Sequence, residues 1–544
     1  MSRNTDLRSK NGMHRAVILA AVGLLAVVLS NSQCKAQTTD AAAGAPPIDQ
    51  PQLAPPSDTA PSDAALPNDA AIPNDAAALD LDASEDFDVL TSGPVHEAFA
   101  DLVPLDADEL LTVDREPPQP VDEVPPEVQP DDDSVWVPGY WNFDPQIEDF
   151  VWVTGVYRKP PPGRRWVPGY WTEVDDGWQR IPGFWAPIEE QTVNYLPMPP
   201  ASLELGPSSP APNDNCFWIP GRWSWPTKGY AWQAGCWATV QPNWVWVPTH
   251  YAWTPGGCIR IPGYWDYPFY NRGLLYAPIY YRRPLYLTSA YRFYPRVLWN
   301  TSRLVFNLFA HPRGRHYYYG NYYGPLNAGR GILPWYAYSR TRGYYDPLFT
   351  YYRHDWRRSP FDRSYSSWDK FQYGHYRHVH DHAAARPPRT FAEYHKRFPS
   401  HHGRGPQQGF DGRRPGRGPD SFGPGDPRIA FRADDLLRDR RTGSGGNGPG
   451  YRRVADADRD RLRQLSSQWR TLESARRTNE RTLGSGAAPG GNPPARLGQS
   501  GGGSDERAPH RARGRSAGGP PGGGRLSPSA PPARNPPSAS AGCR

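Results

Sequence analysis

A six-residue pattern that recurs at a nearly constant spacing constrains the fold of this chain more than any other feature. One copy reads Trp136-Val-Pro-Gly-Tyr-Trp141, with an aromatic residue at each end and glycine at the fourth position. The fourth positions of the eight copies are residues 139, 155, 169, 183, 221, 235, 249 and 263. Apart from a first step of 16 residues and a gap of 38 residues, each step is 14 residues, which indicates a repeat architecture.

The residue six places before each fourth position indicates how one repeat folds. In all eight copies it is glycine, asparagine or aspartate, which tolerate the left-handed backbone of a tight turn. These residues are Asp133, Asp149, Gly163, Gly177, Asn215, Gly229, Asn243 and Gly257. Each unit is therefore expected to be one strand and one turn. The predicted fold class is mostly β: an antiparallel meander of eight 14-residue Trp-x-Pro-Gly-x-Trp units, with long disordered flanks and one short C-terminal helix.

The Pro-Gly step inside each strand predicts a break in the hydrogen-bond ladder, because proline lacks an N–H and both residues mark bulges. A one-residue bulge would bring the two motif tryptophans onto one face, where indoles of neighbouring strands can cover the flat Pro-Gly surface. We expect the core to contain Trp136, Trp141, Trp166, Trp171, Trp218, Trp223, Trp232 and Trp237. The two blocks of strands, 134–187 and 215–267, could form two small sheets or close together as a barrel.

The Trp-x-x-Gly-x-Trp units resemble those of the WXXGXW-repeat family of exported bacterial proteins. This chain departs from the pattern at Tyr157 and Tyr251 in the last position, at Arg180 and Arg260 in the first, and at Thr249 in the fourth. Tyrosine keeps a stacking plane, whereas the two arginine units are expected to be terminal or solvent-facing strands. The resemblance implies an extracytoplasmic β-rich module and implies no particular reaction.

The repeat domain, residues 134–267, holds sixteen of the 21 tryptophans, so that region has the apolar mass for a core. Residues 37–133 form an acidic segment rich in Pro, Ala and Asp that is expected to be a disordered tether. Scattered apolar residues within 80–113 allow a transient helix there. Residues 268–398 are a Tyr- and Arg-rich extension that is expected to pack on the repeats.

Residues 399–544 form a low-complexity tail rich in Gly, Pro and Arg. One helix is expected within it, at residues 454–483. Apolar side chains recur there at spacings of three and four residues on an otherwise charged segment, which is typical of an amphipathic helix. They are Leu462, Leu465, Trp469 and Leu472.

The first 36 residues, 1–36, are expected to be a signal peptide. Arg3, Arg8, Lys10 and Arg15 precede an apolar run at residues 16–29, which is short for a helix that spans a bilayer. Lipidation of Cys34 and an uncleaved membrane anchor are the alternatives. The expected location is the periplasm, the cell surface or the extracellular space.

Three cysteines, Cys216, Cys236 and Cys258, lie in the repeat domain and are disulfide candidates, because an exported protein folds in an oxidising compartment. Their spacings of 20 and 22 residues match no zinc motif. One disulfide and one remaining thiol are the expectation, with the pairing left open.

Four tryptophans in the repeat domain are not required by the motif. Trp178, Trp225, Trp244 and Trp253 could stack on the sugar rings of an envelope glycan, or could complete the core or a contact with the extension. A second candidate site is a run of histidines: on a strand, His378, His380 and His382 would share a face and could bind a divalent metal. The alternative is a solvated histidine tract.

The sequence contains no recognisable nucleophile motif, phosphate-binding loop, zinc-protease helix or structurally framed pair of carboxylates. It therefore predicts an exported, non-enzymatic cell-envelope protein with a structural or binding role and no cofactor. The repeat would be an interaction module for an envelope glycan or envelope protein. An envelope polysaccharide hydrolase is one alternative. Binding of a nucleic acid or other polyanion by the basic tail is another, although no specific nucleic acid is expected.

Overall fold

A computed structural model describes residues 85–103, 109–130, 132–190, 192–341, 345–358, 365–398, 429–441 and 450–484. In this part of the chain, strands outweigh helices, and the named strands form small antiparallel sheets, as the sequence predicted for the fold class. The expected signal peptide, Cys34, the first part of the tether and the last 60 residues lie outside the described residues.

The motif copies pair two by two, so that each pair forms one long β-hairpin. The first hairpin contains β5 (Val135–Val137), β6 (Tyr140–Asp144), β7 (Asp149–Val153) and β8 (Val156–Arg158). The second contains β9 (Arg164–Val167), β10 (Tyr170–Val174), β11 (Gly177–Ile181) and β12 (Phe184–Pro187). The third contains β14 (Cys216–Ile219), β15 (Arg222–Ser224), β16 (Ala231–Gln233) and β17 (Cys236–Thr239). The fourth contains β18 (Val245–Val247), β19 (His250–Thr254), β20 (Gly257–Ile261) and β21 (Tyr264–Asp266).

A continuous meander is not confirmed, because none of the described strands joins one hairpin to the next. The hairpins pair instead with strands from elsewhere in the chain. These are β3 (Thr112–Val113) on β11, β13 (Tyr195–Leu196) on β20, β22 (Gly273–Leu275) on β8 and β23 (Ile279–Tyr281) on β7. Gly177 and Gly257, at the tips of the second and fourth hairpins, have φ of 140° and 126°, which explains glycine at these two turns.

Each hairpin is interrupted at its middle, where the fourth-position residues of two motif copies face each other. We call this point the waist. The four waists are Gly139 with Gly155, Gly169 with Gly183, Gly221 with Gly235, and Thr249 with Gly263. The strand pairing therefore breaks on both strands of a hairpin at the same level, and at least one of the two strands carries a proline there.

Indole rings cover the waist glycines of the opposite strand. A Cβ placed on Gly155 would lie 2.4 Å from Cζ2 of Trp136, and one on Gly183 would lie 2.3 Å from Cζ2 of Trp166. The aromatic residues also meet across the hairpin in edge-to-face pairs, for example Trp218 with Trp237 at a centroid distance of 5.4 Å. Where an indole covers the waist, as at Gly155 and Gly183, glycine is needed because any side chain would occupy the space of the indole.

The expected core tryptophans divide by hairpin. Trp136, Trp141, Trp166 and Trp171, in the first two hairpins, are buried. The other four belong to the third hairpin and are only half-buried: Trp218, Trp223, Trp232 and Trp237. The third hairpin therefore contributes less to the core than the sequence pattern predicted.

The segment that precedes the repeats is part of the core, which differs from the tether expected over 37–133. Val95, Phe99 and Val121 have no exposed surface. The segment includes β1 (Phe87–Val89), β2 (Gly93–Pro94), β3 and β4 (Val128–Pro130). Its scattered apolar residues have no helical or alternating period because they fill space between hairpins rather than one face of an element.

The Tyr- and Arg-rich extension shares a buried cluster with the repeats, since Trp299 and Trp335 belong to the same cluster as Trp141 and Trp166. Its strands after β23 are β24 (Val297–Trp299), β25 (Leu308–His311), β26 (His316–Tyr319) and β27 (Leu333–Pro334). Its α-helices are α3 (Trp335–Tyr338), α4 (Pro347–Arg358), α5 (Trp368–Asp381) and α6 (Phe391–Arg397). Short 3₁₀ turns lie at Phe269–Asn271, Leu285–Leu287, Thr301–Phe306 and Ala383–Ala385.

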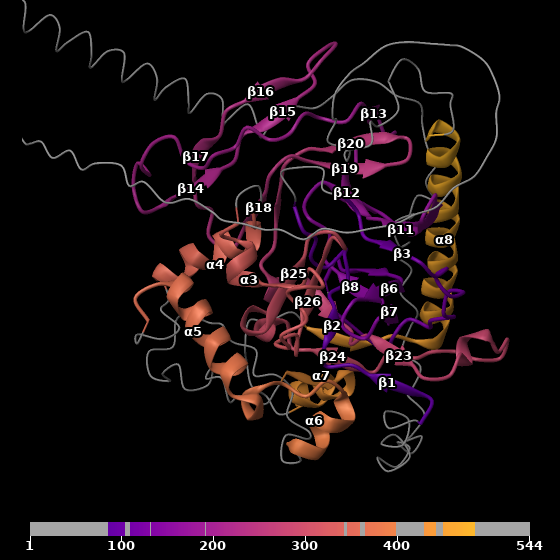
Figure 1. The fold of residues 1–544 in the computed structure, drawn as a ribbon. Coiled ribbons are helices and arrows are strands. Elements are labelled where there is room, and N and C mark those ends of the chain that lie inside the picture. The colour runs from indigo at the N-terminus through magenta and orange to yellow at the C-terminus, as the bar shows by residue number, and fades with distance from the viewer. Residues whose placement is uncertain are drawn as a thin grey trace, which may run out of the picture. The chain divides into compact units, whose positions relative to one another are not determined.

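Part of the expected low-complexity tail also folds against the rest of the chain. Strand β28 (Ala430–Arg432) pairs with β24, and β29 (Tyr451–Arg453) pairs with β4. Helix α7 (Ala433–Arg441) follows β28, and α8 (Asp456–Gly484) corresponds to the helix expected at 454–483. Figure 1 shows α8 as the long helix beside the hairpins, where it contacts β5, β10 and β20. None of the described helices is both long and apolar enough to cross a membrane.

Candidate functional site

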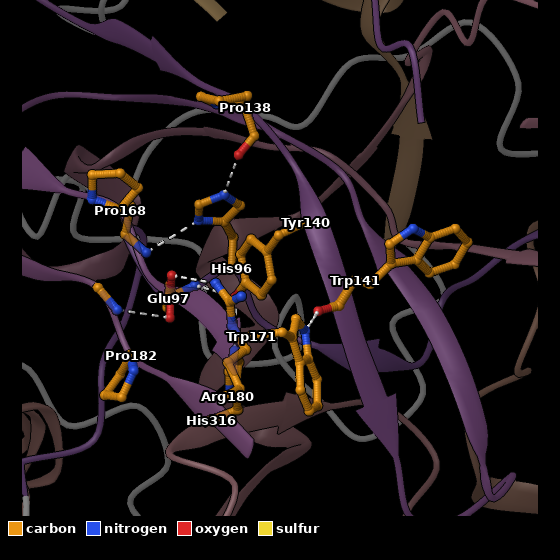
Figure 2. A network of polar contacts seen from close by, with 12 residues as sticks. His96, Glu97, Pro138, Tyr140, Trp141, Pro168, Trp171, Arg180, Pro182 and His316 are labelled. Atoms are coloured by element: carbon orange, nitrogen blue, oxygen red, sulfur yellow. Dashed lines mark hydrogen bonds and ion pairs between the residues drawn. The ribbon is translucent and has the colours of Figure 1, made fainter. Parts of the chain in front are cut away.

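The waist of the second hairpin binds a buried carboxylate, that of Glu97. Its Oε2 accepts the N–H of Gly183 at 3.2 Å, and its Oε1 lies against Gly169. Oε1 also accepts from Arg180 Nη2 at 2.6 Å (Figure 2). Arg180 is buried, not solvent-facing as we expected from its place in the motif, because it occupies a tryptophan position beside this carboxylate. Burial alone would raise the pKa of Glu97, but the charge of Arg180 holds it below the ordinary value.

The waist of the first hairpin binds a second carboxylate in the same way. Glu123 Oε2 accepts the N–H of Gly139 at 2.8 Å, and Oε1 accepts the N–H of Gly155 at 3.0 Å. Trp152 Nε1 also donates to Oε1, at 3.5 Å. None of the ion pairs described for this chain involves Glu123, and its burial raises the pKa to about 7.

The third and fourth waists are satisfied by different acceptors. Glu204, from the linker between the two blocks, accepts the N–H of Gly221 through Oε2 and the Nε1–H of Trp218 through Oε1 at 3.0 Å. In the fourth hairpin Thr249 itself supplies the acceptor, since its Oγ1 lies 2.9 Å from the N of Gly263. Each waist therefore has an oxygen acceptor for an N–H that the broken ladder leaves without a partner.

Near Glu97, both ring nitrogens of His96 and of His316 form hydrogen bonds. His96 Nε2 donates to the carbonyl of Pro138 at 3.2 Å, and His96 Nδ1 accepts from Ala98 N. His316 Nδ1 donates to Gly314 O, and its Nε2 accepts the hydroxyl of Tyr140 at 2.7 Å. Burial lowers the pKa of both histidines to about 4, so both are neutral near pH 7.

This buried network is structural rather than a reaction site. His96, Glu97 and His316 are at most 2% exposed, and the adjoining cavity is about 20 Å³, the size of one water molecule. A substrate has no access to these groups. On the opposite side of the same peptides, Arg476 of α8 donates to Pro168 O at 2.7 Å and to Pro182 O at 3.0 Å. The second waist thus lies between the Glu97 anion and the Arg476 cation.

A cleft of about 560 Å³ opens among the repeats. It lies between the second, third and fourth hairpins and the linker strand β13. Arg165, Arg222 and Arg260 contribute guanidinium groups to its wall, and Trp225 contributes an indole that is half-buried. Glu190 is the carboxylate among the lining residues, and its backbone carbonyl accepts from Arg165 at 2.7 Å. The wall is therefore aromatic and carries a net positive charge.

Of the four ligand-stacking candidates, Trp225 lines this cleft and the other three lie elsewhere. Trp178 pairs with Val113 of β3 and packs on the main core. Trp253 packs with Leu110, Tyr170 and Ile181. Trp244 lies 4.9 Å from the ring of Tyr267. The four tryptophans could not be distinguished by sequence pattern, because all of them occupy positions outside the motif.

The histidine candidates lie on a helix and not on the strand that we expected. His378 and His380 belong to α5, and His382 caps its C-terminal end. His378 and His382 stack at 4.7 Å, whereas His380 points away from them because residues two apart lie on different faces of a helix. In the part of the chain described, no three His, Cys, Asp or Glu side chains are grouped so that they could bind a metal ion.

The expected disulfide among the three repeat cysteines is not formed. Cys216 and Cys258 are free thiols. Cys216 pairs in register with Thr239, while Cys236 pairs with Ile219, so the two lie three residues apart along β14 and β17. That separation is about 10 Å, beyond the reach of a disulfide. Cys258 belongs to the fourth hairpin, where its Sγ lies 3.6 Å from the sulfur of Met198.

The functional residues that sequence reasoning missed are the three waist carboxylates and the three cleft arginines. Two of the carboxylates could have been suspected from sequence, because Glu123 and Glu204 each have an aliphatic neighbour in a proline-rich segment. A charged side chain that is buried in such a segment requires a hydrogen-bond or charge partner.

No family model, no curated protein and no solved structure matches this chain.

Proposed function

We propose that this chain is an exported cell-envelope protein that binds rather than transforms its ligand, and that its cleft takes an anionic saccharide. The cleft between the hairpins is the observation that carries the proposal. A volume of about 560 Å³ suits a few sugar rings, and the concave wall combines an indole with three guanidinium groups. The basic and apolar runs of residues 1–36 support export.

The side chains of the wall have the chemistry for an acidic sugar. Trp225 offers a ring face, and its contact with Tyr230 at 4.8 Å holds it in place. Arg260 and Arg165 can each bind a carboxylate or phosphate through two parallel hydrogen bonds. Asn194 and Gln233, also in the wall, can pair with hydroxyl groups.

Binding is favoured over hydrolysis because the lining of the cleft contains one carboxylate, Glu190, whereas glycoside hydrolysis ordinarily uses two. The alternative of polyanion binding through the basic tail concerns residues that lie largely outside the described part of the chain. An envelope protein remains the second candidate partner.

We also infer that the eight motif copies are one repeated module, used as four two-copy hairpins, in keeping with the resemblance to WXXGXW-repeat proteins. The recurrence of an oxygen acceptor at every waist supports this interpretation. Four rigid hairpins around a cleft suit a binding scaffold, because binding groups on paired strands keep their geometry.

The test is binding of the full chain to an acidic polysaccharide, alginate, with neutral dextran as the comparison. Titration calorimetry should give saturable binding of alginate oligosaccharides and none of dextran. The variants Trp225→Ala and Arg260→Gln should each weaken alginate binding at least tenfold. Trp244→Ala, outside the cleft, is the matched control and should bind as the unaltered protein does. Binding that survives both cleft substitutions, or release of shortened alginate chains, would refute the proposal.

A further inference from the structure

We propose that the third hairpin is a receptor for an extended, proline-rich peptide of a partner protein that carries a glutamate between small or aliphatic residues. In this structure the receptor is occupied by the chain's own linker, residues 197–209. The peptide-binding surface consists of the waist and the outer aromatic residues of this hairpin.

The linker is bound in the manner of a peptide ligand. Its Glu204 carboxylate sits at the waist, on Gly221 N and Trp218 Nε1. On either side, aromatic donors bind its backbone carbonyls. These contacts are Tyr230 Oη to Pro197 O at 2.6 Å, Trp223 Nε1 to Ala201 O at 3.0 Å, and Trp237 Nε1 to Ser209 O at 3.2 Å.

Such contacts select a proline-rich ligand. The donors all come from the hairpin, and the acceptors are backbone carbonyls, the carboxylate and the hydroxyl oxygen of Ser209, so the ligand needs none of its own N–H groups for them. Proline-rich peptides are recognised in this way by aromatic surfaces, since proline has a carbonyl but no N–H. The linker matches, because four of its thirteen residues are proline: Pro197, Pro199, Pro200 and Pro207.

The first hairpin binds another segment of the chain by the same arrangement. Glu123 sits at its waist, Trp141 Nε1 donates to Gln119 O at 2.8 Å, and Tyr157 Oη donates to Pro126 O at 3.5 Å. Trp141 and Trp223 hold the same motif position, as do Tyr157 and Trp237. Recognition of a glutamate-bearing, proline-rich segment is therefore a property of the hairpin design and not of one linker.

Exposure singles out the third hairpin as the one whose ligand can be exchanged. In the first hairpin the bound segment is part of the core, with Val121 fully buried and Glu123 3% exposed. In the third hairpin the residues that flank Glu204 face solvent: Leu203 is 57% exposed and Leu205 is 83% exposed. The linker is thus held here mainly by its polar contacts, and segments with few buried apolar contacts open most readily.

The fourth hairpin is closed to such a ligand, because the Thr249 hydroxyl already occupies the acceptor position at its waist. The second hairpin is closed by Glu97, which is 2% exposed. In the linker, the bound carbonyls lie three residues before and five residues after the glutamate. A partner segment with this spacing would make the same contacts in the third hairpin.

The test uses the full chain with the substitution E204A, which leaves the waist of the third hairpin without its carboxylate. The probe is a fluorescein-labelled synthetic peptide of residues 197–209, followed by fluorescence anisotropy. We expect saturable binding that is at least tenfold tighter to the E204A protein than to the unaltered chain, in which the linker competes. The same peptide with Glu204→Gln should bind at least tenfold more weakly, because its amide lacks the charge.

The protein variant E204A/W223F is the control for the carbonyl contacts, since phenylalanine keeps a ring but has no N–H. It should bind the peptide several-fold more weakly than E204A alone. If E204A loses the circular dichroism spectrum of the unaltered chain, E204Q takes its place with the same expectations. Absence of saturable binding by a folded variant, or equal binding of the glutamate and glutamine peptides, would overturn the proposal.

Discussion

Thr249 stands where the other seven motif copies carry glycine, and its Oγ1 accepts the N–H of Gly263 at 2.9 Å. The three other waists take their acceptor from outside the hairpin, as a glutamate that precedes the hairpin in the chain. The departure of this one copy from the motif is therefore a replacement for a missing carboxylate. It shows that the N–H at the waist must be satisfied, by whichever oxygen the chain can supply.

The hydroxyl of Thr249 can be removed without changing the shape of its side chain. T249V should destabilise the protein by about 1–3 kcal/mol, because the N–H of Gly263 would be left without an acceptor beside a buried residue. T249S keeps the hydroxyl and should cost clearly less. Urea unfolding followed by tryptophan fluorescence measures both values. Equal stabilities of T249V and T249S would contradict the role of the hydroxyl.

The waist glycines should not tolerate a methyl group. In G183A the new Cβ would lie 2.3 Å from Cζ2 of Trp166, so the indole must move, and overpacking of this kind costs about 1–3 kcal/mol. G329A is the matched control, because the nearest atom to its Cβ would be 3.5 Å away. Its effect should stay within about 0.5 kcal/mol. Thermal unfolding of G183A, G329A and the unaltered chain measures both losses of stability. Equal stability of the two variants would contradict the prediction.

The repeat could be predicted from sequence because its determinants are local. The motif and its turn residues, such as Gly177 and Gly257, act over a few residues. The periodic apolar face likewise predicted a helix at residues 454–483, close to the observed bounds of α8. The waist acceptor Glu97 could not be predicted in the same way. Glu97 reaches a glycine 86 residues further along the chain, and no local pattern encodes that contact.

The assignment of disorder was wrong for residues 85–103 and 109–130 for a related reason. A low content of apolar residues argues against an independent core, but a segment can also fill a space that other elements leave open. Val95 and Val121 do this between hairpins that have their own pairing. The position of the cleft could not be predicted either, because Arg165, Arg222 and Arg260 come from three hairpins and lie near one another only in the folded chain.

Glu123 should make stability depend on pH. Burial raises its pKa to about 7 in the folded protein, above the ordinary value of 4.5 that applies to the unfolded chain. Between these values the folded state binds more proton than the unfolded state, so the free energy of unfolding falls as the pH rises from about 4.5 to about 7. The contribution lost over this range is about 3 kcal/mol.

The substitution E123Q isolates this contribution, because the amide oxygen can still accept a waist N–H but does not titrate. We expect the unaltered chain to lose stability relative to E123Q as the pH rises from 5 to 8, measured by urea unfolding at each pH. Other titrating groups cancel in the comparison. Parallel pH profiles for the two proteins would show that Glu123 is ionised throughout this range.

Arg476 and Glu480 form an ion pair on α8, with their charged groups 2.8 Å apart. Arg476 also donates to the carbonyls of Pro168 and Pro182, so it joins the helix to the second waist. R476M should cost about 3–5 kcal/mol, because it leaves Glu480, which has no exposed surface, as an uncompensated buried charge. The double variant R476M/E480Q removes that charge and should recover part of the loss in urea unfolding. Should the double variant be as unstable as R476M, the cost would lie in the lost carbonyl contacts rather than in the charge left on Glu480.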